Sequence, residues 1–279
     1  MSVDPRPGET GQTPRRAVPV WVVAVVAVVV LVVAVVVTYA ATRTTAGPPA
    51  PSPTAASPTP PETTPAMGDP AGGYKIEAGD GGTDVAVDGR TPIGYDQDCS
   101  GAVSAATNYY VAVLEGLYQD RHTSESFSEL LKQINGGLDG EVASHTGPMG
   151  ALVTEFETIR DEAEQLGQEF PGVEYHPEWG AFRVEGCAEG ASATVVIEGF
   201  MEATALAPGY SSFDGATIRV SWFKDDWRLI GIETLEPDEN PAAGVVPVDA
   251  AAPLPASLRR AMIAAGGTGW TEYTNAPQD

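Results

Sequence analysis

"ATVVIEGFMEAT", residues 193–204, predicts a long β-strand with one buried face. Small and apolar side chains recur at every second position from Ala193 to Ala203, with Thr and Glu among the residues between them, and a period of two is typical of a half-buried strand. Gly199 in its middle predicts a bend. A shorter strand, 181–187, precedes it, and strands 217–224 and 227–235 follow. We therefore expect a four-strand antiparallel meander.

Upstream of these strands the apolar residues recur with the helical period of 3.6. Three amphipathic helices are predicted, with their first and last residues set by capping residues and glycines. The first helix is predicted from Ser100 to Gln119. The second begins at a capping box formed by Ser126 with Glu129 and ends at Gly136, and the third extends from Pro148 to Gly167. Helices followed by strands predict an α+β fold, in which three N-terminal helices pack on a curved four-strand antiparallel sheet, or roll.

An uninterrupted apolar run extends from Val20 to Val37. The segment 17–41 is long enough, as a helix, to cross a hydrocarbon core of about 30 Å. Arg15 and Arg16 precede it and Arg43 alone follows it, so the positive-inside rule places the N-terminus in the cytoplasm and the C-terminus outside the cell membrane. A cleaved secretory signal is the alternative, but the run is longer than the apolar core of such signals.

These patterns predict five parts along the chain. They are a cytoplasmic stub (1–16), a transmembrane helix (17–41), a Pro/Thr/Ala/Gly-rich linker (42–91), an extracytoplasmic roll domain (92–236) and a Pro/Ala-rich tail (237–279) with a short helix at 255–265. Much of the linker has too few large apolar residues to fold and is expected to act as a spacer, with an edge strand at 84–88. We expect the tail to be frayed, with docking through Trp270 and Tyr273 as the alternative.

The chain carries a formal net charge of −23. Such a surface repels nucleic acid and anionic headgroups, so no nucleic-acid partner is expected. The charge is typical of a protein kept soluble in an external medium, and a docking face for basic partners is the alternative. The acidic glycine-rich stretch around Asp84 lacks the spacing of a calcium loop.

Two cysteines, Cys99 and Cys187, are the whole cysteine content. Both fall on the predicted oxidising side of the membrane, where disulfides persist, and we expect them to pair as a structural staple. A redox or nucleophilic role is the alternative, but no cationic residue lies beside either cysteine in the sequence to activate a thiolate.

The order of three helices and then long strands, closing on Ser221–Leu229 ("SWFKDDWRL"), resembles the nuclear-transport-factor-2-like superfamily of cystatin-like rolls. With one anchor and a linker in front, the layout also resembles the bitopic components of conjugation and type IV secretion machines. The composition and the stretch 94–109 resemble membrane proteins of high-GC actinobacteria. The resemblance covers residues 92–236, is architectural, and transfers no functional residue to this chain.

Enzymes with such rolls place an Asp or His with a Tyr in the cleft between sheet and helices. The corresponding candidates here are Tyr109, Tyr110, Glu115 and His122. The three histidines are far apart in the sequence, and motifs for zinc, phosphate or dinucleotides are absent, so we expect no metal and no cofactor. Trp222 and Trp227 are candidates either for an interaction surface or, together with Phe156, for filling the cleft, which is the outcome we expect.

The sequence therefore favours a noncatalytic, single-pass membrane protein whose external roll is a scaffold or interaction module for other membrane or envelope proteins. A role in conjugative transfer or secretion is the narrower form of this hypothesis. The alternative is a domain that binds a small molecule or a cell-wall fragment, and a roll-type isomerase or hydrolase is the third hypothesis.

Overall fold

The computed structural model describes residues 73–136, 146–167, 170, 172–188, 191–203, 210–236, 238–242, 245 and 256–278. The predicted stub, the predicted transmembrane helix 17–41 and most of the predicted linker lie outside these residues. Within the described part of the chain, none of the helices combines the length and hydropathy needed to cross a bilayer.

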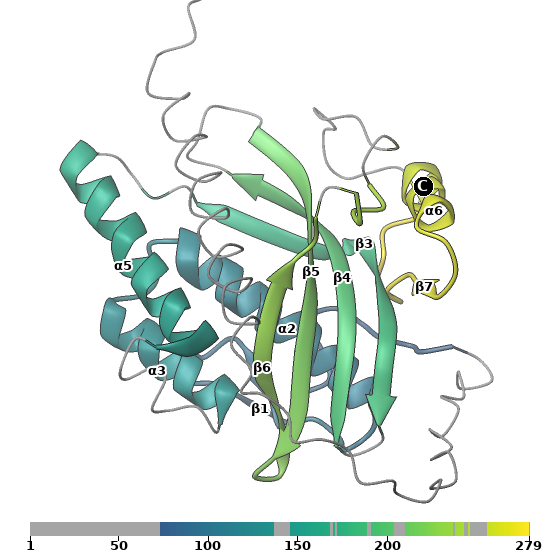
Figure 1. Cartoon of the computed structure of the whole chain (residues 1–279), viewed down its shortest axis with the longest axis horizontal. Helices are drawn as coiled ribbons and strands as arrows, with labels where there is room; N and C mark the ends of the chain where they lie inside the picture. The colour runs from purple at the N-terminus through teal and green to yellow at the C-terminus, as the bar shows by residue number, and fades with distance from the viewer. Residues whose placement is uncertain are drawn as a thin grey trace, which may run out of the picture. The chain divides into compact units, whose positions relative to one another are not determined.

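The fold is α+β, and helices α2, α3 and α5 lie on one side of a curved antiparallel sheet (Figure 1). The elements are β1 (Asp84–Val85), β2 (Pro92–Ile93), α2 (Cys99–Tyr118), α3 (Ser124–Asn135), α5 (Gly147–Leu166), β3 (Val173–Ala188), β4 (Ser192–Ala203), β5 (Tyr210–Phe223), β6 (Asp226–Thr234), α6 (Ala256–Ala265) and β7 (Trp270–Thr271). Helix α2 contacts β3, β4, β5 and β6, and α3 and α5 pack against one another and against α2. The predicted helices-then-strands arrangement is thus confirmed at this level.

The sheet has five strands rather than the predicted four, in the order β6-β5-β4-β3-β7. The additional strand, β7, pairs antiparallel with Phe182 and Arg183 of β3. Two residues are too few to show an alternation, so the sequence pattern contained no signal for it. β1 and β2 form a separate two-stranded sheet, which includes part of the edge strand predicted at 84–88.

Two strands begin earlier than the predicted limits of 181 and 217. β3 starts at Val173, and its pairing with β4 shifts register between His176 and Ala181. An irregularity of this kind interrupts the alternation of side chains, which explains why only the part after it was recognised. β5 starts at Tyr210 and pairs with β4 along the whole length of β4.

The predicted bend residue of β4 makes room for an aromatic ring. A Cβ atom at Gly199 would lie 2.5 Å from Cζ of Tyr175, so a larger residue at this position would displace the ring. Because Gly199 has no side chain, the ring of Tyr175 in β3 can pack against the backbone of β4.

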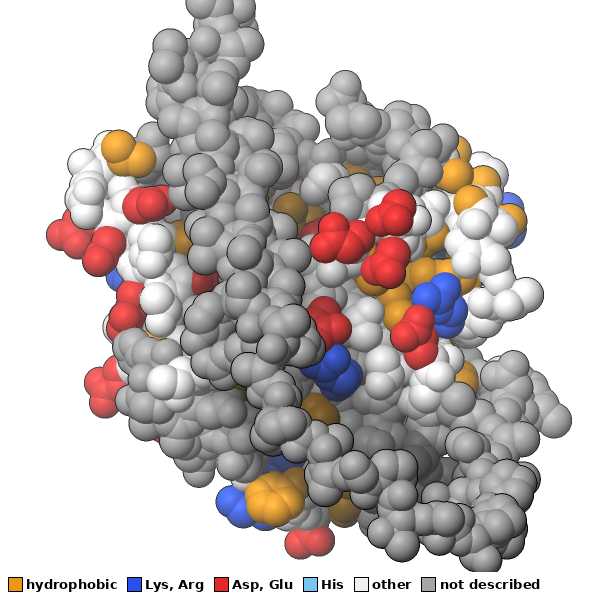
Figure 2. All heavy atoms as spheres, in the orientation of Figure 1, with side chains coloured by type: hydrophobic (Ala, Val, Ile, Leu, Met, Phe, Trp, Pro, Cys, Tyr) orange, Lys and Arg blue, Asp and Glu red, His pale blue; other side chains and the backbone are white. Residues whose placement is uncertain are grey.

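The hydrophobic core lies between α2 and the inner face of the sheet, and it extends beyond the predicted domain limits of 92 and 236. Ile76 and Ala86, which the sequence assigned to the linker, and Tyr273, which it assigned to the tail, belong to this core. Acidic side chains are spread over the described part of the face shown in Figure 2, as the net charge leads one to expect.

The tail docks rather than frays. The helix predicted at 255–265 is present as α6, and it buries Met262 in a second cluster on the outer face of the sheet, with Ala181, Val196 and Trp270. The sequence predicted the helix itself, but nothing in the local pattern showed that the sheet's outer face was apolar enough to receive it. In Figure 1, α6 and β7 lie beside β3, on the far side from α5.

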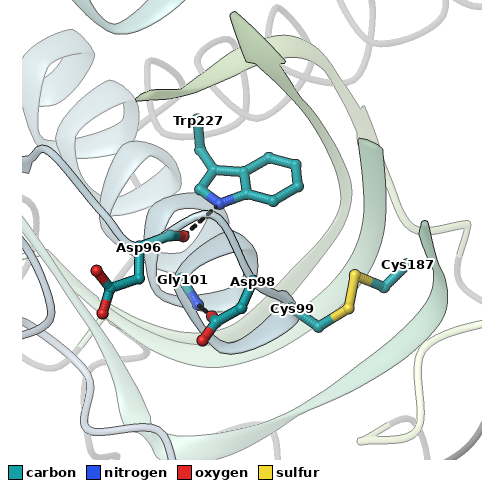
Figure 3. The surroundings of a disulfide bond; sticks show 6 residues. All are labelled: Asp96, Asp98, Cys99, Gly101, Cys187 and Trp227. Atoms are coloured by element: carbon teal, nitrogen blue, oxygen red, sulfur yellow. Dashed lines mark hydrogen bonds between the residues drawn. A yellow bond between two sulfur atoms is a disulfide. The ribbon is translucent and has the colours of Figure 1, made fainter. Parts of the chain in front are cut away.

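The helix caps differ in part from the predicted ones. Asp98, not Ser100, is the N-cap of α2, and its Oδ1 accepts a hydrogen bond of 2.7 Å from the Gly101 amide (Figure 3). Thr123, with Ser126, forms the capping box of α3, in place of the predicted Ser126 with Glu129. A helix can use any of several closely spaced Ser, Thr and Asp residues as its cap, so the pattern located the helix but not its first residue.

The predicted disulfide between Cys99 and Cys187 is present. It joins the first residue of α2 to the end of β3, with the two Cα atoms 6.0 Å apart, a distance that suits a disulfide. Beside it, the indole N–H of Trp227 donates to the carbonyl oxygen of Asp96 at 2.8 Å (Figure 3). The disulfide from β3 and the hydrogen bond from β6 therefore hold the start of α2 and the segment just before it to the sheet.

Candidate functional site

A cleft of about 460 Å³ lies beside α2. It is bounded by α2, by the segment that leads into β2, by the turn between α2 and α3, and by the beginning of β3. Its ionisable lining residues are Asp88, Arg90, Glu115, Arg121, His122 and Glu178. The cleft thus combines side chains from four separate parts of the chain. Two of its lining residues, Glu115 and His122, are site candidates from the sequence.

Glu115 joins two arginines in this cleft. Its Oε2 lies 3.0 Å from Nη1 of Arg121 and 3.9 Å from Nη2 of Arg90. Partial burial raises the pKa of Glu115 despite the opposing charge of Arg90. Both guanidinium groups are more exposed than the carboxylate, so the cluster presents its N–H donors rather than its carboxylate to solvent.

His122 lies in the same cleft, with its Nδ1 3.3 Å from Oγ of Ser126 and its ring tilted against Phe127. Partial burial lowers the pKa of His122, with Asp88 opposing this and Arg90 adding to it. The imidazole is accordingly neutral at physiological pH and contributes a hydrogen-bonding group rather than a charge.

A buried cluster of two tyrosines and a carboxyl group lies next to the cleft. The hydroxyl group of Tyr110 donates to Oδ2 of Asp214 at 2.6 Å, and that of Tyr175 donates to the backbone oxygen of Asp214 at 2.9 Å. The two tyrosine rings meet edge to face, with their centroids 5.1 Å apart. Tyr175 also lines the cleft, so it connects the cluster to it.

Burial raises the pKa of Asp214, which its hydrogen bonds from Tyr110 and from the Gly215 amide partly offset. A carboxyl group with a raised pKa beside a tyrosine is suited to proton transfer when a substrate reaches it. Neither Asp214 nor Tyr110 lines the cleft, however. In this structure their hydrogen bond satisfies a partly buried carboxyl group and ties β5 to α2.

A second buried carboxyl group, Glu198, lies on the outer face of the sheet. It shares that face with Val196, and a Cβ atom at Gly215 would meet both Oε2 of Glu198 and the side chain of Leu235. Glu198 is fully buried, and among the described residues neither of its oxygens has a hydrogen-bond partner of normal geometry. Burial, together with the charge of Asp214, raises its pKa to about 8.

The remaining sequence candidates pack in or against the core between helices and sheet instead of lining the cleft. Tyr109 and Trp227 are buried in the core, and the Tyr109 hydroxyl group donates to the backbone oxygen of Trp227 at 2.9 Å. Trp222 is partly buried and meets Trp227 edge to face, with the ring centroids 5.7 Å apart. Phe156 is also fully buried, so all three residues expected to fill the space between sheet and helices pack in or against the core.

Sequence reasoning missed Arg90, Arg121, Asp214 and Glu198. Asp214 lies in the part of β5 that was not recognised as a strand, so its position opposite Tyr110 was hidden. Glu198 was assigned to the solvent-exposed face of its strand, and the period of the strand did not show that side chains such as Leu235 cover that face. His145 lies outside the described residues, and among those that are described, no group of three or more His, Cys, Asp or Glu residues is arranged to hold a metal ion.

Comparisons with models of protein families, with curated proteins and with solved structures find no match to this chain.

Proposed function

We propose that this protein is a noncatalytic interaction module, displayed outside the cell membrane by an N-terminal anchor at 17–41. The observation that carries this proposal is the filled interior of the roll. Trp227, Phe156 and Tyr109 occupy the space between helices and sheet in which roll enzymes and roll carriers hold their substrate or ligand. A domain with such an interior acts through its outer surface.

Three further features support an external, tethered domain. The disulfide between Cys99 and Cys187 is of the kind that persists in an oxidising compartment. The Pro-rich sequence before residue 73 provides reach between the bilayer and the domain. The acidic surface favours partners with basic or neutral faces and disfavours nucleic acid.

Photo-crosslinking in living cells tests the proposal. The full chain would carry a photoreactive residue at Phe223, an exposed apolar side chain beside the β5–β6 turn, or, as a matched position on another face, at Leu166. We expect defined protein adducts from at least one position, and we expect them to disappear when the chain is released from the membrane by replacing residues 1–41 with a cleaved secretory signal. Absence of any protein adduct from both positions would contradict the proposal.

The cleft beside α2 favours a second candidate function, that of an external domain that binds a small molecule. A volume of about 460 Å³ lies within the usual range for such sites, and the cleft has both charged and apolar walls. A small molecule that raises the melting temperature of the full chain in detergent, in cells that yield no protein adduct, would favour this function over the first.

A further inference from the structure

We propose that the cleft beside α2 binds a small zwitterion, an amino acid or a short peptide, with its carboxylate on Arg90 and Arg121 and its ammonium group on Glu178. This inference rests on the second candidate function and names its ligand class. It follows from which polar groups of the cleft are already used within the protein and which are not.

The two arginines are the donors available to a ligand. Arg121 gives one hydrogen bond to Glu115, and Arg90 makes one ion pair with the same oxygen. A guanidinium group carries five N–H donors in a planar fork that matches a carboxylate. The side chains of Arg90 and Arg121 are 59% and 41% exposed and both line the cleft, so the structure leaves them N–H donors for a ligand.

The carboxylates of the cleft differ in how far their oxygens are occupied. Asp88 accepts hydrogen bonds from the backbone amides of Arg90 and Thr91 and from the Thr91 hydroxyl group, so its oxygens are used within its own turn. Glu115 is held by the two arginines. Glu178, which enters the cleft from β3, has its Oε1 3.1 Å from Nδ1 of His176 and keeps a second oxygen for a cation.

The walls of the cleft suit a compact organic molecule. Pro92, Val111, Ala112 and Pro177 provide apolar surface between the charged groups. Such a combination, apolar walls with a few placed charges, is typical of small-molecule sites.

The charge of the whole protein narrows the ligand class further. With a net charge of −23, the protein repels polyanions such as phosphorylated compounds over long distances, whatever the arginines do locally. A zwitterion has no net charge, and it therefore approaches without this penalty while offering one group of each sign to the cleft.

Isothermal titration of the full chain in detergent tests the inference, with trialanine as the probe. Its C-terminal amide lacks the carboxylate, its N-acetyl derivative lacks the ammonium group, and free alanine distinguishes a site for amino acids from a site for short peptides. We expect saturable binding of trialanine or alanine, weakened about tenfold or more in the amide and in the acetylated form.

Variants assign the two ends of the probe. Arg121→Gln and Arg90→Gln should weaken binding of the zwitterion but not of the amide, and Glu178→Gln should reduce the difference between the free and acetylated amines. Arg219→Gln is the matched control, because Arg219 is an exposed arginine on β5 that pairs with Glu233 at 2.8 Å, outside the cleft.

No saturable binding of alanine or trialanine to the unaltered chain at millimolar concentration would overturn the inference, independently of whether any variant folds. Binding that the amide and the acetylated form share equally would overturn it as well. A different compound that raises the melting temperature would preserve the ligand-binding function while this ligand class fails, whereas protein adducts together with no ligand would remove both.

Discussion

At the scale of single residues, Glu198 lies in an environment that its ionised side chain disfavours. Burial, with the charge of Asp214 adding to it, disfavours the ionised form of this carboxyl group and raises its pKa from the ordinary 4.5 to about 8. Between these two values the unfolded chain has released the proton that the folded chain still holds. Stability therefore falls as the pH rises from about 5 to about 8.

Glu198→Gln should remove this penalty. The amide is neutral in both states, so the variant should be more stable than the original chain by on the order of 2 kcal/mol at pH 7, with little difference near pH 4. Urea unfolding between pH 4 and pH 9 measures both effects. Glu202→Gln is the control, because Glu202 lies on the same strand but is partly exposed. Equal pH dependence in the Glu198 variant and the original chain would show that this carboxyl group is not buried as described.

At the scale of elements, the start of α2 distinguishes the observed cap from the expected one. The Asp98 side chain accepts a hydrogen bond from the Gly101 amide, whereas Ser100 lies inside the helix. Asp98→Ala should cost about 1 kcal/mol of stability, because it leaves an amide of the first helical turn without its acceptor. Ser100→Ala should change stability by much less, and thermal unfolding of the two variants side by side checks the assignment. A larger loss from Ser100→Ala would restore the cap expected from the sequence.

The disulfide acts between elements, since it ties the start of α2 to the end of β3 across a separation of 88 residues. In the chain-entropy model, closing a loop of this length stabilises the fold by about 4.6 kcal/mol. Replacing both Cys99 and Cys187 with Ala should lower the urea midpoint, and dithiothreitol should lower that of the original chain but not that of the double variant. An unchanged midpoint after both thiols become titratable would contradict a stapling role.

Elements with a long, regular period were predictable from the sequence, and contacts between distant segments were not. Helix α5 and strand β4 have many residues on one repeating pattern, and their types and approximate limits emerged correctly. The first half of β3 contains an irregular pairing, and β7 is two residues long, so neither has a usable period. The same limit applies to the cleft. Arg90 and Arg121 lie in two loops and Glu178 in the irregularly paired part of β3, and only the fold brings these three residues together beside α2.

At the scale of the whole molecule, the two ends of the described chain hold one another. The Thr274 amide donates to the backbone oxygen of Ile76 at 2.7 Å, and the Asn275 side chain exchanges two hydrogen bonds with the backbone of Ala78. The Tyr273 hydroxyl group lies 3.0 Å from Oγ1 of Thr107 in α2. The segment that leads from the linker into the domain is thus fixed by the tail.

This arrangement predicts the effect of deleting residues 256–279. Loss of 256–279 removes α6 and β7 and exposes the outer cluster with Val196, so stability should fall by several kcal/mol. Hydrogen exchange should show faster exchange at the amide of Ala78, which loses its acceptor on Asn275, than at amides within α2. Unchanged protection of the Ala78 amide in a folded, shortened chain would mean that the tail does not fix the segment that leads from the linker into the domain.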